Sequence, residues 1–313
     1  MIENLYPILP TVHADMLFMH APAVFDFRDR TDIYFPYLST SGDVPITPLY
    51  EYFPLGFKSL QRILSENGYK VELLNLSSLL LKYPQIDVAS LFRALDVRIL
   101  GIDLHWMIHV QGSLAVAELF KRINPDTAVI FGGISSTYFA HELIRYPFID
   151  MVMRGYDTHQ PMTQLLGALG DEPQMHKVPN LFWKNKQGEI IDNGYSHISS
   201  TLSCGIDWST IPTQQSSGAS LPIQEVIATQ NAGCAYNCGW CGGSRDAYLR
   251  INQLDHNMKS TIHKPLEETT YEFKTMAQIP GKENYHFYTV NSYSETNSRF
   301  DFFMDQVAEA NFK

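Results

Sequence analysis

Hydrophobic residues in the first half of the chain form short runs that alternate with longer amphipathic segments. Five runs rich in leucine or β-branched residues have the length of strands, at 16–22, 69–76, 97–104, 127–133 and 149–155. Three segments between them carry hydrophobic residues at helical spacing, at 54–68, 113–124 and 136–146. Nearly all-apolar strands alternating with helices predict an α/β domain, a doubly wound parallel sheet covered on both faces.

The pattern changes after about residue 170. The next stretch predicts a small hairpin over 180–193 that turns at Gln187-Gly188, followed by a polar linker at 213–222. A second strand–helix series then predicts elements at 223–230, 265–278, 285–290 and 299–311. We therefore expect three parts, at 1–170 (doubly wound domain), 171–222 (hairpin and linker) and 223–313 (second α/β domain).

Polar residues and glycines follow the predicted strands of the first domain. Parallel sheets bind ligands beyond the carboxyl ends of their strands, where the strand order reverses. The candidates there are Asp103, His105, Trp106, His109, Gly132, Gly133 and Gly155. His105 and His109 are also explained as hydrogen-bonded polar residues of a strand end. No G-x-G-x-x-G motif occurs, so a dinucleotide site of the usual form is unsupported.

Composition and charge narrow the class of protein. Hydrophobic residues make up 45% and charged residues 18%, without a low-complexity block, which is typical of a folded globular protein. The net charge is −10 and no Lys/Arg-rich run is present, so we expect no nucleic-acid partner. No window approaches 18 uninterrupted apolar residues, and the N-terminus lacks a secretory pattern. We therefore expect a cytoplasmic protein without membrane association.

Three of the four cysteines, Cys234, Cys238 and Cys241, are spaced C-x3-C-x2-C. Structural zinc sites need four ligands, usually in two separated pairs. The further residues that could complete such a site are Cys204, His256 and His263. A disulfide would leave one clustered thiol over. The remaining interpretation is an iron–sulfur cluster with three protein ligands, which leaves one iron open for a substrate.

The stretch GCAYNCGWC, placed after a strand at the start of a β/α series, resembles the cysteine loop of the radical S-adenosylmethionine (radical SAM) superfamily. The resemblance implies that Cys234, Cys238 and Cys241 hold a [4Fe–4S] cluster whose open iron chelates S-adenosylmethionine (SAM). Trp240 would line the adenine end of SAM or pack beneath the loop. The nearby glycines that would help the chain wrap around the cluster include Gly242 and Gly243.

A glycine–glycine–glutamate-like turn often follows the second barrel strand in complete members of this family. By position alone, the matching candidates here are Asn291, Ser292 and Glu295. A helix-capping role for residues of this stretch is an equal alternative.

The order of a doubly wound domain ahead of this loop resembles the cobalamin (B12)-dependent branch of the superfamily, whose first domain is Rossmann-like. The resemblance extends from about residue 16 to the end, and it implies that residues 103–109, Gly132, Gly133 and Gly155 contact cobalamin. No D-x-H-x-x-G motif follows the first strand, and the D-x-H letters at 103–105 follow the third. We therefore expect that no histidine reaches cobalt in the usual way. Cobalamin would sit base-off, with residues near 103–109 packed beneath it.

This resemblance implies an enzyme, a methyltransferase that acts on an unactivated carbon or phosphorus through a 5′-deoxyadenosyl radical and methylcobalamin. It also implies an external electron donor of the flavodoxin or ferredoxin type. The alternatives are a radical SAM enzyme for rearrangement or cyclisation, and a cobalamin-binding or iron–sulfur electron-transfer protein without radical chemistry. Only residues 242–313 follow the cysteine loop and they predict two β/α units, so we expect a truncated barrel. The sequence specifies no substrate and no catalytic residue.

Overall fold

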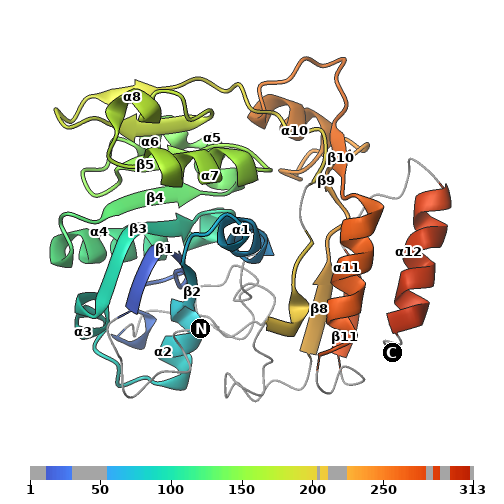
Figure 1. Cartoon of the computed structure of the whole chain (residues 1–313), viewed down its shortest axis with the longest axis horizontal. Coiled ribbons are helices and arrows are strands. Elements are labelled where there is room, and N and C mark those ends of the chain that lie inside the picture. The colour runs from blue at the N-terminus through green and yellow to red at the C-terminus, as the bar shows by residue number, and fades with distance from the viewer. Residues whose placement is uncertain are drawn as a thin grey trace. The chain divides into compact units, whose positions relative to one another are not determined.

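The computed structural model describes residues 12–29, 55–202, 205–210, 224–279, 285–289 and 297–310. The chain divides into two compact units, the first ending at His197 and the second beginning at Ile198. The first unit contains a seven-stranded sheet, and the second contains two sheets of two strands each (Figure 1).

The sheet of the first unit has the strand order β2-β1-β3-β4-β5-β6-β7. Its strands are β1 (Val12–His20), β2 (Val71–Asn75), β3 (Leu95–Asp103), β4 (Ala128–Gly132), β5 (Met151–Met153), β6 (Leu181–Lys184) and β7 (Ile190–Asp192). Strands β1 to β5 pair in parallel, whereas β6 pairs antiparallel with both β5 and β7. The predicted doubly wound sheet is confirmed, and its strand order reverses between β1 and β3.

Helices cover both faces of this sheet. They are α1 (Leu55–Glu66), α2 (Leu76–Lys82), α3 (Val88–Arg93), α4 (Val110–Ile123), α5 (Ile134–Tyr138), α6 (Ala140–Leu143), α7 (His159–Ala168) and α8 (Glu172–Met175), with 3-10 turns η2 (Phe27–Asp29) and η3 (Met107–His109). Helices α2, α3, α4 and α6 contribute buried residues to one face, and α1 and α7 contribute to the other. The helix predicted over 136–146 is broken into α5 and α6 at Phe139.

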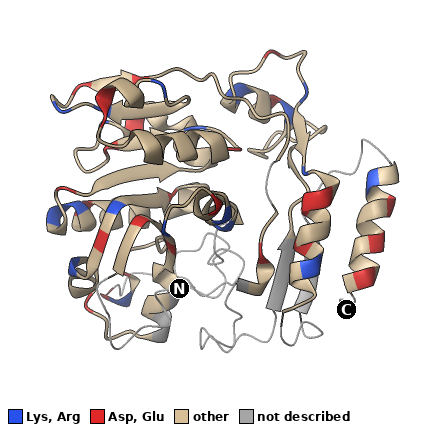
Figure 2. Cartoon of the chain, in the orientation of Figure 1, with Lys and Arg blue, Asp and Glu red and all other residues tan. Residues whose placement is uncertain are grey.

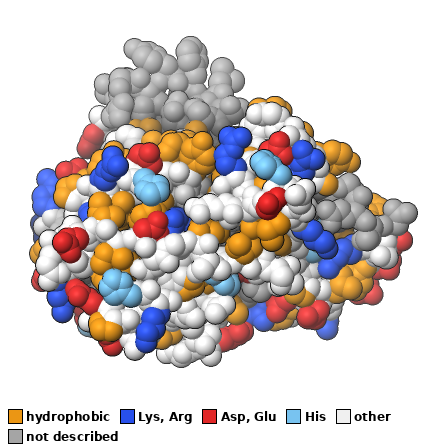
Figure 3. Space-filling model, turned by 90° about the horizontal axis from the view of Figure 1, so that it is seen from above, with side chains coloured by type: hydrophobic (Ala, Val, Ile, Leu, Met, Phe, Trp, Pro, Cys, Tyr) orange, Lys and Arg blue, Asp and Glu red, His pale blue; other side chains and the backbone are white. Residues whose placement is uncertain are grey.

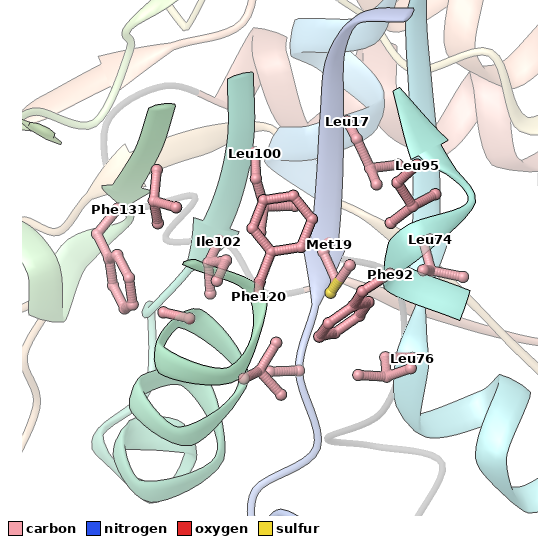
Figure 4. Packing of buried hydrophobic residues seen from close by; sticks show 14 of the residues in the cluster. Leu17, Met19, Leu74, Leu76, Phe92, Leu95, Leu100, Ile102, Phe120 and Phe131 are labelled. Atoms are coloured by element: carbon pink, nitrogen blue, oxygen red, sulfur yellow. The ribbon is translucent and has the colours of Figure 1, made fainter. Parts of the chain in front are cut away.

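The core consists of two hydrophobic clusters, one on each face of the sheet. Along β1, Leu17 and Met19 belong to one cluster, whereas Met16 and Phe18 belong to the other. Successive side chains of a strand point to opposite faces, so a strand buried on both sides reads as one apolar run. Figure 4 shows the first cluster, with Phe120 of α4 among the strand side chains.

The hairpin predicted over 180–193 forms as β6 and β7, but it belongs to the sheet of the first unit. β6 pairs antiparallel with β5, with Val152 opposite Phe182, and Phe182 and Trp183 are buried against the sheet. The turn closes where the Gly188 N–H donates to the carbonyl oxygen of Asn185 (2.9 Å). The first unit therefore continues to His197, beyond the end expected at 170, because these two apolar residues need a buried face.

Among its described residues, the second unit contains two small sheets and three helices. Strand β8 (Gln224–Ala228) pairs parallel with β11 (Tyr285–Thr289), and β9 (Asn231–Gly233) pairs antiparallel with β10 (Thr261–His263). The helices are α10 (Arg245–Ile251), α11 (Leu266–Met276) and α12 (Asn297–Ala310), with a 3-10 turn η4 (Trp208–Thr210). β8, α11, β11 and α12 correspond to the strand–helix series predicted from the sequence.

Residues 205–208, which belong to the expected linker region, are hydrogen-bonded to α11. Three of their backbone N–H groups donate to side chains of that helix, to Glu268 (2.6 Å), Glu272 (2.9 Å) and Thr275 (3.1 Å). Positions four and seven residues along a helix share a face, so one side of α11 satisfies all three donors. Glu272 also forms a buried ion pair with Lys264.

Charged side chains are distributed over both units. Helices α11 and α12 each carry acidic and basic residues (Figure 2). On the face drawn in Figure 3, Lys and Arg side chains are interspersed with acidic, hydrophobic and uncharged ones. Within the described part of the chain, no helix is long and apolar enough to cross a membrane.

Replacing Gly112 by alanine is expected to destabilise the first unit. Gly112 lies where α4 passes the segment 22–23: its N–H donates to the Ala23 carbonyl (3.1 Å), and a Cβ would lie 1.7 Å from the backbone oxygen of Pro22. Backbone atoms cannot move aside by changing rotamer, so we expect a loss of about 1–3 kcal/mol, measured by urea denaturation.

The matched control is Gly56→Ala in α1, where a Cβ would meet no atom within 4 Å. Alanine is favoured over glycine in a helix by about 1 kcal/mol, so this control should be neutral or stabilising. Equal behaviour of the two variants would contradict the close approach at Gly112.

Candidate functional site

Three histidines and one aspartate meet at the carboxyl ends of β1 and β3. His20 is the last residue of β1, and Asp103 is the last residue of β3. The Nδ1 atom of His20 lies 3.0 and 3.1 Å from the two carboxylate oxygens of Asp103, and Nδ1 of His105 lies 2.6 Å from one of them. We call His20, Asp103, His105 and His109 the His–Asp cluster. It lies where the strand order reverses, the usual ligand position of such sheets.

The three imidazole rings are close together but differ in exposure. Ring centroids are 5.0 Å apart for His20 and His109, 5.8 Å for His105 and His109, and 6.1 Å for His20 and His105. His20 and His109 are buried, whereas the His105 side chain is 29% exposed. Of the three side chains, that of His105 is therefore the one that solvent reaches.

Asp103 is a buried carboxylate. Burial by itself acts to raise the pKa of Asp103, but the charges and hydrogen bonds of His20 and His105 outweigh burial and hold the pKa below its usual range. An ionised carboxylate only accepts hydrogen bonds, so the Nδ1 atoms of both rings must donate to it. The aspartate thereby sets the orientation of His20 and His105.

The loop after β3 is fixed by the neighbouring strand and helix. Leu104 donates its N–H to the Gly132 carbonyl (2.8 Å) and accepts at its own carbonyl from the Ser136 N–H (3.0 Å). Gly133 has φ 103°, and a Cβ there would lie 2.9 Å from the His105 nitrogen. Gly133 therefore lets β4 approach the protein's own loop closely. At Gly132, in contrast, a Cβ would meet no atom within 4 Å.

Exposed apolar groups flank the His–Asp cluster. Trp106 is 45% exposed and Met107 is 47% exposed, and the Trp106 ring lies edge-on to His105 with centroids 6.0 Å apart. Gly155 follows β5 and donates its N–H to Thr137 of α5 (3.0 Å). This sheet edge thus offers exposed apolar side chains, open space next to Gly132 and one partly exposed imidazole, a combination suited to a partly apolar ligand.

The structure brings the predicted residues Asp103, His105 and His109 into one cluster, with Trp106 beside it. The sequence prediction did not include His20 among the site residues. Its signal was its place at the end of an apolar strand, combined with the strand order of a doubly wound sheet, which puts the first and third strands side by side.

A second buried hydrogen-bonded chain joins α7 to α1. Asp157 contacts Nδ1 of His159, and Nε2 of His159 contacts the hydroxyl of Ser59. Ser59 is buried in the middle of α1, so its hydroxyl is not open to a substrate. We assign this chain to the packing of α1 on α7.

The cysteine loop connects β9 to α10 in the second unit. Its first carbonyl, that of Cys234, accepts a hydrogen bond from the Ser260 hydroxyl (3.0 Å). At the other end, the Arg245 N–H donates to the Tyr236 carbonyl (2.9 Å), and the Asn237 amide donates to Asp246 (2.6 Å). Both ends of the loop are therefore fixed to secondary structure.

The middle of this loop faces solvent. Cys238 is exposed, and Cys234 and Cys241 are partly buried. Trp240 is 91% exposed, so in this structure it does not pack beneath the loop. Gly242 and Gly243 lie between Cys241 and α10. The nearest atom to a Cβ added at Gly243 would be the Cys241 sulfur, at 3.9 Å.

The three loop cysteines are free, and the described ranges hold no group of three or more His, Cys, Asp or Glu side chains with metal-site geometry. Their chemistry nevertheless fits an iron–sulfur cluster, because the set consists of thiols on a loop with fixed ends. Metal binding commonly completes the geometry of its own ligands. Cys204, Asn291, Ser292 and Glu295 lie outside the residues that the structure describes.

Comparison with known protein families finds one match, which lies within the first unit. Residues 43–162 match the family model of the B12 binding domain. No curated protein matches the sequence.

The fold also resembles solved structures. One is the radical S-adenosylmethionine methyltransferase TsrM from Kitasatospora setae, solved with a tryptophan substrate and a SAM analogue (14% identity, TM-score 0.60, 95% of this chain and 51% of TsrM). Another is the cobalamin-dependent S-adenosylmethionine radical enzyme OxsB, solved with aqua-cobalamin and S-adenosylmethionine (16% identity, TM-score 0.59, 96% of this chain and 38% of OxsB). TsrM was also solved with cobalamin and a [4Fe–4S] cluster (15% identity, TM-score 0.56, 95% of this chain and 50% of TsrM).

At these identities the likeness to solved structures establishes a shared fold. The chain spans about half the length of TsrM and 38% of OxsB. The resemblance stated from the sequence is confirmed: residues 43–162 match the B12 binding domain, and the solved structures that share the fold include cobalamin-dependent radical SAM enzymes.

Proposed function

We propose that this chain is a cobalamin-dependent radical SAM enzyme. The observation that carries the proposal is the joint occurrence of a B12 binding domain match over 43–162 and a C-x3-C-x2-C loop directly after a strand of the second unit. A doubly wound sheet alone binds many ligands, and three cysteines alone have other uses. Together they favour one class of enzyme, to which the structural neighbours also belong.

In the first unit, the residues that would contact cobalamin lie at the carboxyl edge of the sheet. Trp106 and Met107 would pack against the apolar parts of the ligand, and the open space over Gly132 would admit it close to the backbone. The predicted contacts of His109 and Gly155 are less direct, since His109 is buried and Gly155 lies on the neighbouring strand end.

In the second unit, Cys234, Cys238 and Cys241 would hold the cluster as thiolates. The exposed side chains of Tyr236 and Trp240 would then line the SAM site from the same loop. When bound, the cluster would supply the electron that cleaves SAM, and cobalamin would carry the methyl group. The chain's own part is to hold the loop ends on Ser260, which precedes β10, and on α10, so that the cysteines close around the cluster.

We further propose methyl transfer to an unactivated carbon or phosphorus centre, with an external flavodoxin or ferredoxin as electron donor. The methyltransferase TsrM, which shares the fold, supports this reaction type. The net charge of −10 disfavours a nucleic-acid partner. We also propose a cytoplasmic location without membrane association, because clustered free thiols persist in that compartment.

Anaerobic reconstitution tests the proposal. We expect about four irons per chain, with an EPR spectrum of the reduced cluster that changes when SAM is added. We also expect cobalamin to remain with the protein through gel filtration. Uptake of zinc in place of iron, or a cluster whose spectrum ignores SAM, would exclude radical SAM chemistry, and cobalamin lost on the column would exclude the B12 assignment.

A further inference from the structure

We infer that Asn237 is a positioning residue for the cluster: its side chain, paired with Asp246 of α10, holds the backbone of Cys238 where the thiolate can bind iron. The inference rests on the cluster-binding part of the proposed function and is independent of cobalamin. Asn237 itself makes no bond to the cluster, and its contribution is made before iron binds.

The side chain of Asn237 contacts Asp246 at two points. The N–H of Asp246 donates to the Oδ1 atom of Asn237 (3.2 Å), and the Nδ2 atom of Asn237 donates to a carboxylate oxygen of Asp246 (2.6 Å). A backbone N–H can only donate, so Oδ1 must face it, and this fixes which way the amide points. Two hydrogen bonds to one planar group restrict its rotation, so Asn237 is held in a single orientation.

The same contact caps the start of α10. The first N–H groups of a helix have no partner within it, and the side chain of the residue just before the helix commonly binds one of them. Ser244 occupies that position, but its side chain makes no cap hydrogen bond. The cysteine loop binds two of these N–H groups instead. The Tyr236 carbonyl accepts from Arg245 (2.9 Å), and the Asn237 side chain accepts from the next residue. The loop and the helix therefore stabilise each other.

Of the three loop cysteines, Cys238 depends most on this contact. The carbonyls of Cys234 and Cys241 accept hydrogen bonds from the residues just before β10 and α10, at 3.0 and 3.1 Å. Cys238 is exposed, and its carbonyl accepts from the Cys241 N–H (3.2 Å), which belongs to the same loop. Asn237 directly precedes Cys238, so its side chain connects this cysteine to a helix outside the loop.

Holding Cys238 in advance matters because the site has few ligands. A cubane cluster is normally held by four cysteine thiolates, and this loop supplies three. A ligand that is already ordered loses less conformational freedom when the metal binds, so supporting contacts strengthen a metal site. Solvent competes for the hydrogen bonds of an exposed residue such as Asn237, so we expect a moderate effect.

The rate at which the reconstituted protein loses iron to a chelator tests the inference. Under anaerobic conditions, Asn237→Ala should lose its cluster about 10-fold faster than the wild type, the lower end of what removing an outer-shell partner costs in metal affinity. Asn237→Asp should also lose it faster, because this variant places a second carboxylate against that of Asp246. The decay of the cluster's visible absorbance measures both rates.

Exchanging the two residues should restore the contact. In the double variant Asn237→Asp/Asp246→Asn, an amide again faces a carboxylate, and the backbone N–H of α10 keeps its acceptor. We expect the loss of iron to return to within about twofold of the wild-type rate. Hydrogen exchange of the α11 amides, measured on the same samples, should be equal in wild type and variants. This second measurement separates positioning of the loop from a general effect on the second unit.

The hairpin of the first unit offers a matched control. The Asn185 amide donates to the Glu189 carboxylate (2.8 Å), and its oxygen accepts the Glu189 N–H (2.9 Å), so the same two-point contact occurs there. Asn185→Ala removes this contact from a turn without cysteines and should leave the rate of iron loss unchanged.

A wild-type rate of iron loss in Asn237→Ala would overturn the positioning role and leave the proposed function intact. The same holds if the exchanged double variant loses iron as fast as Asn237→Asp, or if Asn237→Ala also removes the protection of the α11 amides. Failure of the wild-type chain to take up iron would overturn both the inference and the proposed radical SAM function.

Discussion

Replacing Cys238 by serine is expected to abolish cluster binding and, with it, all cleavage of SAM. Three thiolates are fewer than a cubane cluster normally has, so the loss of one leaves two and no stable site. Cys238 is exposed, and its carbonyl oxygen, which serine retains, accepts the Cys241 N–H (3.2 Å). The substitution should therefore leave the fold unchanged. Iron and sulfide content and the visible absorbance of the reconstituted protein measure the effect.

The control is Cys204→Ser, at the one cysteine outside the C-x3-C-x2-C motif. We expect it to retain the full iron content and the response of the cluster EPR spectrum to SAM. If Cys204→Ser lost the cluster as completely as Cys238→Ser, the site would have four protein ligands and no open iron. That result would refute the radical SAM mechanism and leave an electron-transfer protein.

Replacing Lys264 by methionine is expected to destabilise the second unit by about 3–5 kcal/mol, the usual cost of removing one partner of a buried ion pair. Lys264 and Glu272 are both buried and paired with each other. Burial raises the pKa of Glu272, although Lys264 and the Ile206 N–H act in the opposite direction. Without Lys264 the buried carboxylate of Glu272 loses its ion-pair partner, and its pKa should rise further.

The stability lost in Lys264→Met should depend on pH, because the pKa of Glu272 is raised in the folded state. A carboxyl whose folded pKa lies above its unfolded pKa binds its proton more tightly in the folded state, so stability falls as pH rises through the folded pKa. The defect of Lys264→Met should therefore be largest at neutral pH and smaller near pH 4. Hydrogen exchange of the α11 amides, followed by mass spectrometry at both pH values, measures it.

The double variant Lys264→Met/Glu272→Gln should recover most of the stability, because glutamine removes the charge and keeps an oxygen for the Ile206 N–H. An exposed pair serves as the control: Arg62→Ala breaks the ion pair of Arg62 with Glu66 on α1 and should cost about 0.3–0.5 kcal/mol. A single variant Lys264→Met as stable as this control would show that the buried pair carries no stability.

Much of the first unit could be predicted because its strands are buried on both faces. Residues 16–19 of β1 are all core residues, and such an uninterrupted apolar run is typical of an inner strand of a parallel sheet. Helix α2 could not be predicted because it starts directly after β2, where its leucines continue the apolar run of the strand. The place of the hairpin in the sheet depends on the pairing of Phe182 with Val152, and no local pattern encodes that pairing.

In the candidate sites, too, some features could be predicted from the sequence and others depend on the fold. Asp103 and His105 could be predicted together because they are two residues apart at a strand end. The part of His20 was missed, because its contact with Asp103 follows only when the strand order of a doubly wound sheet is used to place β1 beside β3. The spacing of the cysteines predicts which atoms bind a cluster, but the position of their sulfurs depends on the cluster itself.

The hydrogen bonds between residues 205–208 and α11 affect where an independent fragment of the second unit should begin. The sequence suggests starting such a fragment at residue 223, where the strand–helix series begins. That boundary would remove Ile206 and Trp208, both buried, and expose the polar face of α11 that they cover. A fragment that is to fold and be crystallised or labelled by itself should therefore begin upstream of Gly205.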